Sequence, residues 1–323
     1  MYKFLICLFL VSTITTGGAQ LLSVTRLVLG GGAIGLYAGI GALTTLQDSG
    51  FYNMQNCTGV NDGALLCAFL VAGIPAAAID ALVLLPSNYS RPLDYPTVGA
   101  NIVNNGSVFY TSDEGVELVQ LAMTISTLNP NSTFAELYAA TGRYLCVLVY
   151  NENLRQVEYM NKDTTPNVIV AYAVAASLAE TFLYNHVGLT VNYTGVPTAY
   201  NYSTAAVRNN YPINVYSGAL SSTIGINYVF DYDTVNWSYN DSAQANLIIG
   251  MSNLYQYLMN PSLNIPETPT EFTLNIVMPA GIIQYSHLLT EETKTELILQ
   301  GSNNMCTYLQ GRYTLPPPLC VVT

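Results

Sequence analysis

The apolar positions of the chain concentrate in two long stretches near its N-terminus. The first, Leu27–Gln47, contains no charged residue, and the second runs over Gly63–Leu85. As a helix, the first would be roughly 31 Å long, which is enough to span a bilayer. The second is interrupted by Pro75, which would break a helix, and by Asp80, which is costly at mid-membrane without a partner. We therefore predict an apolar helical block over residues 20–85.

Glycines give this block a close-packing face, because Gly31, Gly35 and Gly39 recur every four residues. The pattern leaves three interpretations open. The block spans a membrane as a hairpin, is buried inside a secreted domain, or associates with other copies in an insoluble matrix. Pro75 and the glycosylation motif at Asn56 favour the two interpretations without a membrane span.

The rest of the chain alternates between helix-like and strand-like patterns. Residues 86–106 are rich in Asn, Pro, Gly and Ser and predict a linker, with an α+β domain over 107–323. Apolar periodicity predicts these elements: helices over 112–128, 131–141, 167–186, 241–260 and 290–300, and strands over 144–150, 156–160 and 271–278. Short β-like runs are predicted over 189–228. The expected fold class is α+β: an apolar, Gly-rich N-terminal helical block followed by a mixed helix and strand domain.

The N-terminus predicts a secretory route. Residues 1–19 combine Lys3, a short apolar run and small residues near Ala19, a pattern typical of a cleaved signal peptide. Eight N-glycosylation motifs follow, and glycans require exposed backbone, so most should lie in loops. The acceptor residues are Asn56, Asn88, Asn105, Asn131, Asn192, Asn201, Asn236 and Asn240. The predicted location is secreted or extracellular.

Cysteine usage is compatible with an oxidising compartment. Once Cys7 is removed with the signal peptide, five cysteines remain. The simplest pairing is local, with one disulfide between Cys57 and Cys67 and another between Cys306 and Cys320. Cys146 then stays as a buried free thiol, because it lies in an apolar run.

Charge excludes one class of partner. The chain has nine basic and twenty acidic residues and a net charge of −11, and its bases form no cluster. Nucleic-acid binding requires clustered Lys and Arg, so we expect none. The diffuse acidity favours solubility, with weak support for cation binding. Self-association or membrane contact through Leu27–Leu85 is the partner interaction that we predict.

No catalytic, metal or cofactor site is predicted. Only His186 and His287 could serve a histidine-based triad, and no G-x-S-x-G motif occurs. Gly30–Gly35 is superficially similar to a dinucleotide loop, but the pattern gives it no strand–turn–helix context. The segment Asp231–Asp241 only partly matches a calcium loop, because Gly and Glu are missing at the required positions.

These observations predict a secreted, N-glycosylated, non-enzymatic extracellular matrix protein. Two alternatives stay open: a membrane-anchored glycoprotein with a lumenal domain, and a secreted hydrolase, degenerate or not, whose site one sequence does not reveal. Enzymatic activity is not excluded, although the absence of a nucleophile–base pair argues against it.

Overall fold

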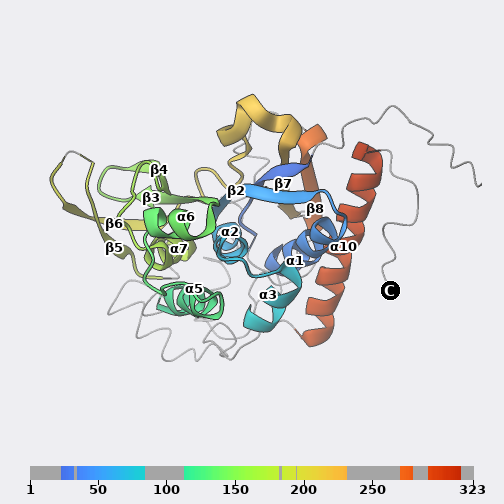
Figure 1. The fold of residues 1–323 in the computed structure, drawn as a ribbon, viewed down its shortest axis with the longest axis horizontal. Helices are drawn as coiled ribbons and strands as arrows, with labels where there is room; N and C mark the ends of the chain where they lie inside the picture. Colours follow the sequence, from blue (N-terminus) through green and yellow to red (C-terminus); the bar gives the residue numbers. More distant parts are fainter. Residues whose placement is uncertain are drawn as a thin grey trace, which may run out of the picture.

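The protein has an α+β fold, as the sequence predicts, built on one mixed sheet (Figure 1). The computed structural model describes residues 23–32, 35–83, 113–181, 184–193, 195–230, 270–278 and 290–313. The predicted signal peptide, the predicted linker 86–106, the predicted helix 241–260 and the segment Asp231–Asp241 lie outside these residues, as does His287.

The N-terminal block begins with a strand rather than a helix. Strand β1 (Val24–Leu29) leads through three glycines into helix α1 (Gly35–Asp48). Strand β2 (Tyr52–Val60) follows and pairs in parallel with β1. The predicted single helix over Leu27–Gln47 is therefore wrong in its first third. Val24–Leu29 is rich in β-branched and apolar residues, which suits a buried parallel strand.

The second half of the block breaks where the sequence predicts. Helix α2 (Asp62–Ala72) ends at Gly73, which adopts the left-handed conformation with φ 97°, and helix α3 (Ala76–Val83) begins after Pro75. A left-handed glycine followed by proline is a common way to end one helix before the next. Neither helix approaches the length of a membrane span.

The sheet contains strands from both sides of the predicted linker 86–106. The domain boundary predicted there therefore does not divide the strands into two sheets. Its order is β5-β6-β3-β2-β1-β7-β8, and β4 also pairs with β3. The parallel members are β1, β2, β3 (Tyr144–Asn151), β7 (Thr223–Phe230) and β8 (Thr273–Met278). Antiparallel pairs add β4 (Gln156–Asn161), β5 (Val187–Val191) and β6 (Thr198–Thr204).

Most of the described helices cover one face of the sheet. They are α1, α2, α3, α5 (Asp113–Ile125), α6 (Phe134–Thr141), α7 (Val170–Leu178) and α10 (Glu291–Tyr313) (Figure 1). Successive side chains of β1 point to opposite faces of the sheet. Leu27 and Leu29 join the core between the sheet and the helices. Val28 instead packs against Tyr211 and Ile213, where the 3-10 segment η2 (Ile213–Ser222) covers the opposite face. A short 3-10 turn, η4 (Thr270–Phe272), precedes β8.

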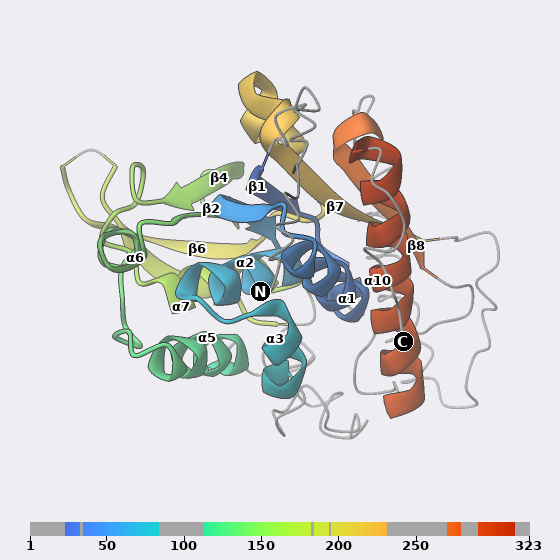
Figure 2. The ribbon, with the colours of Figure 1, turned by 45° about the vertical axis from the view of Figure 1, so that its right-hand side comes forward.

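Several predicted elements are confirmed and two change length. Helices α5 and α6 and strands β3, β4 and β8 fall where the patterns predict, and α6 has the capping box of Thr133 and Glu136. The predicted helix 167–186 shortens to Val170–Leu178, and Gly188 lies inside β5 instead of ending a helix. The predicted helix 290–300 extends to Tyr313 as α10, which lies along α1 (Figure 2).

The close-packing glycine face exists, but the chain itself fills it. A methyl group on Gly35 would lie 2.7 Å from the Tyr228 ring, and one on Gly39 would lie 2.2 Å from the Tyr228 hydroxyl. The described part of the block is thus buried within the domain. Of the three interpretations, burial inside a domain agrees with this packing. Among the described residues, no helix has the length and apolar character needed to cross a bilayer.

Candidate active site

An unusual backbone geometry lies where β2 meets α2. Asn61 stands between Val60, the last residue of the strand, and Asp62, the first residue of the helix, with φ 54° and ψ −130°. Side-chain-bearing residues rarely adopt this conformation, which costs about 1–3 kcal/mol. The strand therefore turns into the helix within a single strained residue.

Two glycines make this tight turn possible. A methyl group on Gly59 would lie 2.3 Å from the carbonyl oxygen of Gly63, and one on Gly63 would lie 2.2 Å from the carbonyl oxygen of Leu29. Both distances are far below van der Waals contact with main-chain atoms that cannot move independently. Positions 59 and 63 therefore have to be glycine for the turn to pack against β1.

Hydrogen bonds fix both the backbone and the side chain of Asn61, which is 1% exposed. Its backbone N–H donates to Ser177 Oγ (2.9 Å), and Ser177 Oγ donates to the Leu148 carbonyl (2.7 Å). Its Nδ2 donates to Glu180 Oε1 (3.0 Å), and its Oδ1 accepts from the backbone N–H of Asp62 (2.7 Å). The Asp62 donor establishes which side-chain atom of Asn61 is oxygen.

A glycine loop lies against this turn. Gly30, Gly31 and Gly32 follow β1, and a methyl group on Gly31 would lie 2.8 Å from Asn61 Cβ and 2.6 Å from Asn210 Oδ1. Asn210 holds the loop, because its Nδ2 donates to the Gly31 carbonyl (2.8 Å) and its own carbonyl accepts from Gly31 N–H (3.2 Å). The glycine loop follows strand β1 and precedes helix α1, so the expectation that it has no strand–turn–helix context is wrong.

The site is electrostatically unusual. Glu180 is 9% exposed and Asp62 is 8% exposed. Burial, and secondarily the nearby Asp62 carboxylate, raise the pKa of Glu180 to about 8, while the bond from Asn61 acts in the opposite direction. Perturbed carboxyl groups gather at functional sites more often than elsewhere.

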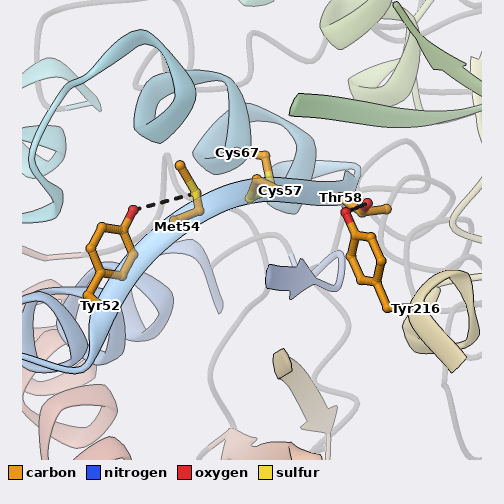
Figure 3. Close-up of a disulfide and its surroundings, with 6 residues drawn as sticks. All are labelled: Tyr52, Met54, Cys57, Thr58, Cys67 and Tyr216. Carbon is orange, nitrogen blue, oxygen red and sulfur yellow. Dashed lines mark hydrogen bonds between the residues drawn. A yellow bond between two sulfur atoms is a disulfide. The ribbon is translucent and has the colours of Figure 1, made fainter. Parts of the chain in front are cut away.

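A disulfide fastens the base of the turn. Cys57 on β2 and Cys67 on α2 are bonded, the local pairing that the sequence favours (Figure 3). On the opposite face of β2, Thr58 Oγ1 and Tyr216 OH are hydrogen-bonded at 2.8 Å, which ties the strand to η2. Cys306 is also disulfide-bonded, and Cys320 lies outside the described residues. Within the described part, Cys146 is the free, buried cysteine that the sequence predicts.

Together these features form a nucleophile elbow without its usual nucleophile. In hydrolases with the G-x-S-x-G motif, a strained strand-to-helix turn presents a serine. The next residue's N–H then helps to stabilise the oxyanion of the reacting ester. Here the segment is Gly59-Val60-Asn61-Asp62-Gly63, so the motif reads G-x-N-x-G. A carboxamide cannot replace the hydroxyl as the attacking group.

Sequence analysis missed this site because it searched for serine. Asn61 lies between the two apolar stretches, and Gly59 and Gly63 flank an asparagine where the G-x-S-x-G motif requires serine. The available signal was a glycine pair four residues apart, placed between a strand-like run and a helix-like run. His186 is not among the residues of this turn and lies about half exposed, with Nδ1 3.7 Å from Glu152 Oε1.

Four of the predicted glycosylation sites lie on described residues: Asn56, Asn131, Asn192 and Asn201. Asn131 and Asn192 are exposed, and Asn201 is exposed on β6. Asn56 lies within β2, whose neighbours β1 and β3 pair on both sides of it, and not in a loop. Asn88, Asn105, Asn236 and Asn240 lie outside the described residues. Within the described part, no group of three or more His, Cys, Asp or Glu residues could hold a metal ion.

At this turn, asparagine stands at the position where the G-x-S-x-G motif has serine. No protein-family model matches the chain. It is 22% identical over 254 residues to the "Uncharacterized protein R571" of Acanthamoeba polyphaga mimivirus, covering 75% of this chain and 76% of that protein. It is also 22% identical over 190 residues to the "Probable lipid hydrolase 463L" of Invertebrate iridescent virus 6, covering 58% of this chain and 62% of that protein.

A solved structure shares the fold. VipD from Legionella pneumophila matches with a TM-score of 0.55 and 14% sequence identity, over 89% of this chain and 67% of VipD. At this identity the likeness concerns the fold alone.

These similarities overturn the predicted function. The chain is similar to a viral protein named as a probable lipid hydrolase and shares the fold of a bacterial protein, and these findings point away from a non-enzymatic matrix protein. They give no support to the predicted signal, glycoprotein or extracellular-matrix role, and those predictions are wrong. The hydrolase alternative agrees better with the findings.

Proposed function

We propose that the protein is a degenerate lipid hydrolase, which binds lipid at its elbow without hydrolysing it through a serine. The observation that carries the proposal is Asn61, held at φ 54° between two obligatory glycines, where a hydrolase of this design places its nucleophile. The relative from Invertebrate iridescent virus 6, a probable lipid hydrolase, supports lipid as the ligand class.

A direct test compares the natural chain with Asn61→Ala and with Asn303→Ala, a control on an exposed position of α10. We expect all three proteins to bind phospholipid vesicles. We also expect all three to hydrolyse phospholipid esters no faster than the heat-denatured protein and to resist labelling by a fluorophosphonate probe. Turnover by the natural chain more than tenfold above Asn61→Ala would overturn the degenerate assignment. Failure to bind any lipid would overturn the ligand class.

A second candidate is hydrolysis by an activated water without a covalent intermediate. Glu180 favours it, because a buried carboxyl with a pKa of about 8 beside Asp62 can exchange a proton near neutral pH. This mechanism predicts turnover that survives Asn61→Ala and is lost in Glu180→Gln. The turnover assay therefore separates the two candidates.

A further inference from the structure

The backbone N–H of Asp62 already has an acceptor. It is the first amide of α2 and directly follows the elbow residue, the position from which a hydrolase of this type stabilises an oxyanion. In this chain it donates to Asn61 Oδ1 at 2.7 Å. The side-chain carbonyl of Asn61 therefore takes the place that the carbonyl oxygen of a substrate would need.

The rest of the carboxamide is held just as firmly. Asn61 Nδ2 donates to Glu180 Oε1 at 3.0 Å, and the residue is 1% exposed, so bulk water does not compete for these bonds. The glycine loop closes the other side, where even a methyl group on Gly31 would overlap Asn61 Cβ. An acyl carbonyl cannot enter this position while the Asn61 side chain stays in it.

The surrounding charge argues against an anionic ligand at the same point. Asp62 is a buried carboxyl residue next to Asn61, and Asn210 Oδ1, on a residue that is 1% exposed, has no hydrogen-bond partner among the described residues and offers an acceptor beside Asn61. A free carboxylate would meet unfavourable electrostatics here. A neutral carbonyl, such as an ester or a carboxamide, suits the site, and the protein supplies its own.

We propose that the Asn61 carboxamide occupies the carbonyl-binding position itself and so acts as a built-in plug. The protein then binds lipids without a hydrogen bond to their ester carbonyl. This inference rests on the proposed lipid binding. It implies that the natural chain treats ester-linked and ether-linked lipids alike. Removing the plug would free the Asp62 N–H for the ester carbonyl, which an ether lacks.

The experiment measures dissociation constants for a short-chain diester phosphatidylcholine and for its diether analogue of equal chain length. For the natural chain and for Asn303→Ala, we expect the two constants to agree within twofold. For Asn61→Ala, we expect the diester to bind about fivefold more tightly than the diether, the effect of about one neutral hydrogen bond. A natural chain that prefers the diester by fivefold or more, or an Asn61→Ala variant without preference, would contradict the plug.

A second readout does not depend on lipid. Hydrogen exchange of the Asp62 amide, followed by NMR, reports whether Asn61 Oδ1 is its acceptor. We expect exchange at least tenfold faster in Asn61→Ala than in the natural chain, and equal rates would overturn the inference. If no lipid binds but the Asp62 amide behaves as expected, the proposed lipid function fails while the plug stands.

Discussion

The strained conformation of Asn61 predicts an inverted order of stability for two substitutions. In a helix interior, glycine is less stable than alanine by about 1 kcal/mol. At φ 54° and ψ −130° the order should reverse, because glycine adopts this conformation without the strain that a side chain imposes. Asn61→Gly and Asn61→Ala remove the same side-chain bonds to Glu180 and Asp62, so their difference isolates the backbone.

The magnitude follows from the separate contributions. Losing two side-chain hydrogen bonds costs each variant about 2 kcal/mol. Relief of backbone strain returns about 1–3 kcal/mol to Asn61→Gly only, and the greater freedom of glycine in the unfolded chain takes back about 0.5–1 kcal/mol. Asn61→Gly should therefore exceed Asn61→Ala in stability by about 1 kcal/mol.

The assay is urea unfolding followed by circular dichroism for four variants. The second pair, Asn303→Gly and Asn303→Ala, changes the same residue type at an exposed position of helix α10. There, alanine should be the more stable by about 1 kcal/mol. If alanine is favoured equally at both positions, Asn61 carries no strain and the argument for an elbow loses its basis.

Two further predictions concern the supports of the site. Gly301→Ala places a methyl group 1.8 Å from the Ala38 carbonyl oxygen, whereas Gly311→Ala in the same helix meets nothing within 4 Å. We expect Gly301→Ala to lower the free energy of unfolding by about 2 kcal/mol relative to Gly311→Ala in urea titrations, and equal values would contradict the close crossing of α1 and α10. Burial raises the pKa of Glu180 from its ordinary value of 4.5 to about 8, so the folded state retains a proton that the unfolded chain releases between these values. Its contribution to stability should fall by up to about 1.4 kcal/mol per pH unit between pH 5 and 8, and urea midpoints should show this loss in the natural chain but not in Glu180→Gln.

Local patterns in the sequence were sufficient for elements whose signals are local. The Thr133 cap and the left-handed Gly142 define α6, and the Gly73–Pro75 break separates α2 from α3. They were insufficient for β1, because a fully buried parallel strand is apolar on both faces and reads like part of an apolar helix. The helix predicted over 167–186 failed for a related reason, since its polar end belongs to the turn that leads into β5.

The candidate site was harder to predict than the fold because its parts come from distant segments. The elbow lies at residues 59–63 and the glycine loop at 30–32. Glu180 contacts the elbow and Asn210 contacts the glycine loop only once the chain has folded. Each residue by itself is unremarkable in type. What marks them is a backbone conformation and a set of main-chain contacts, and neither appears in composition or charge.

The glycines that are compatible with a membrane helix instead allow α1 and the glycine loop to pack closely around the elbow. Gly31 accommodates the Asn61 and Asn210 side chains, Gly35 and Gly39 accommodate the Tyr228 ring, and Gly41 packs against the main chain of α10 at Ile298. Helix α1 is thus fixed between α10 and the sheet, and the loop that precedes it has little freedom to withdraw from the elbow. A carbonyl-binding position bounded by such a loop cannot enlarge by moving backbone. It can only be emptied by changing the side chain that occupies it, which is why Asn61 is the residue on which the binding properties of this site depend.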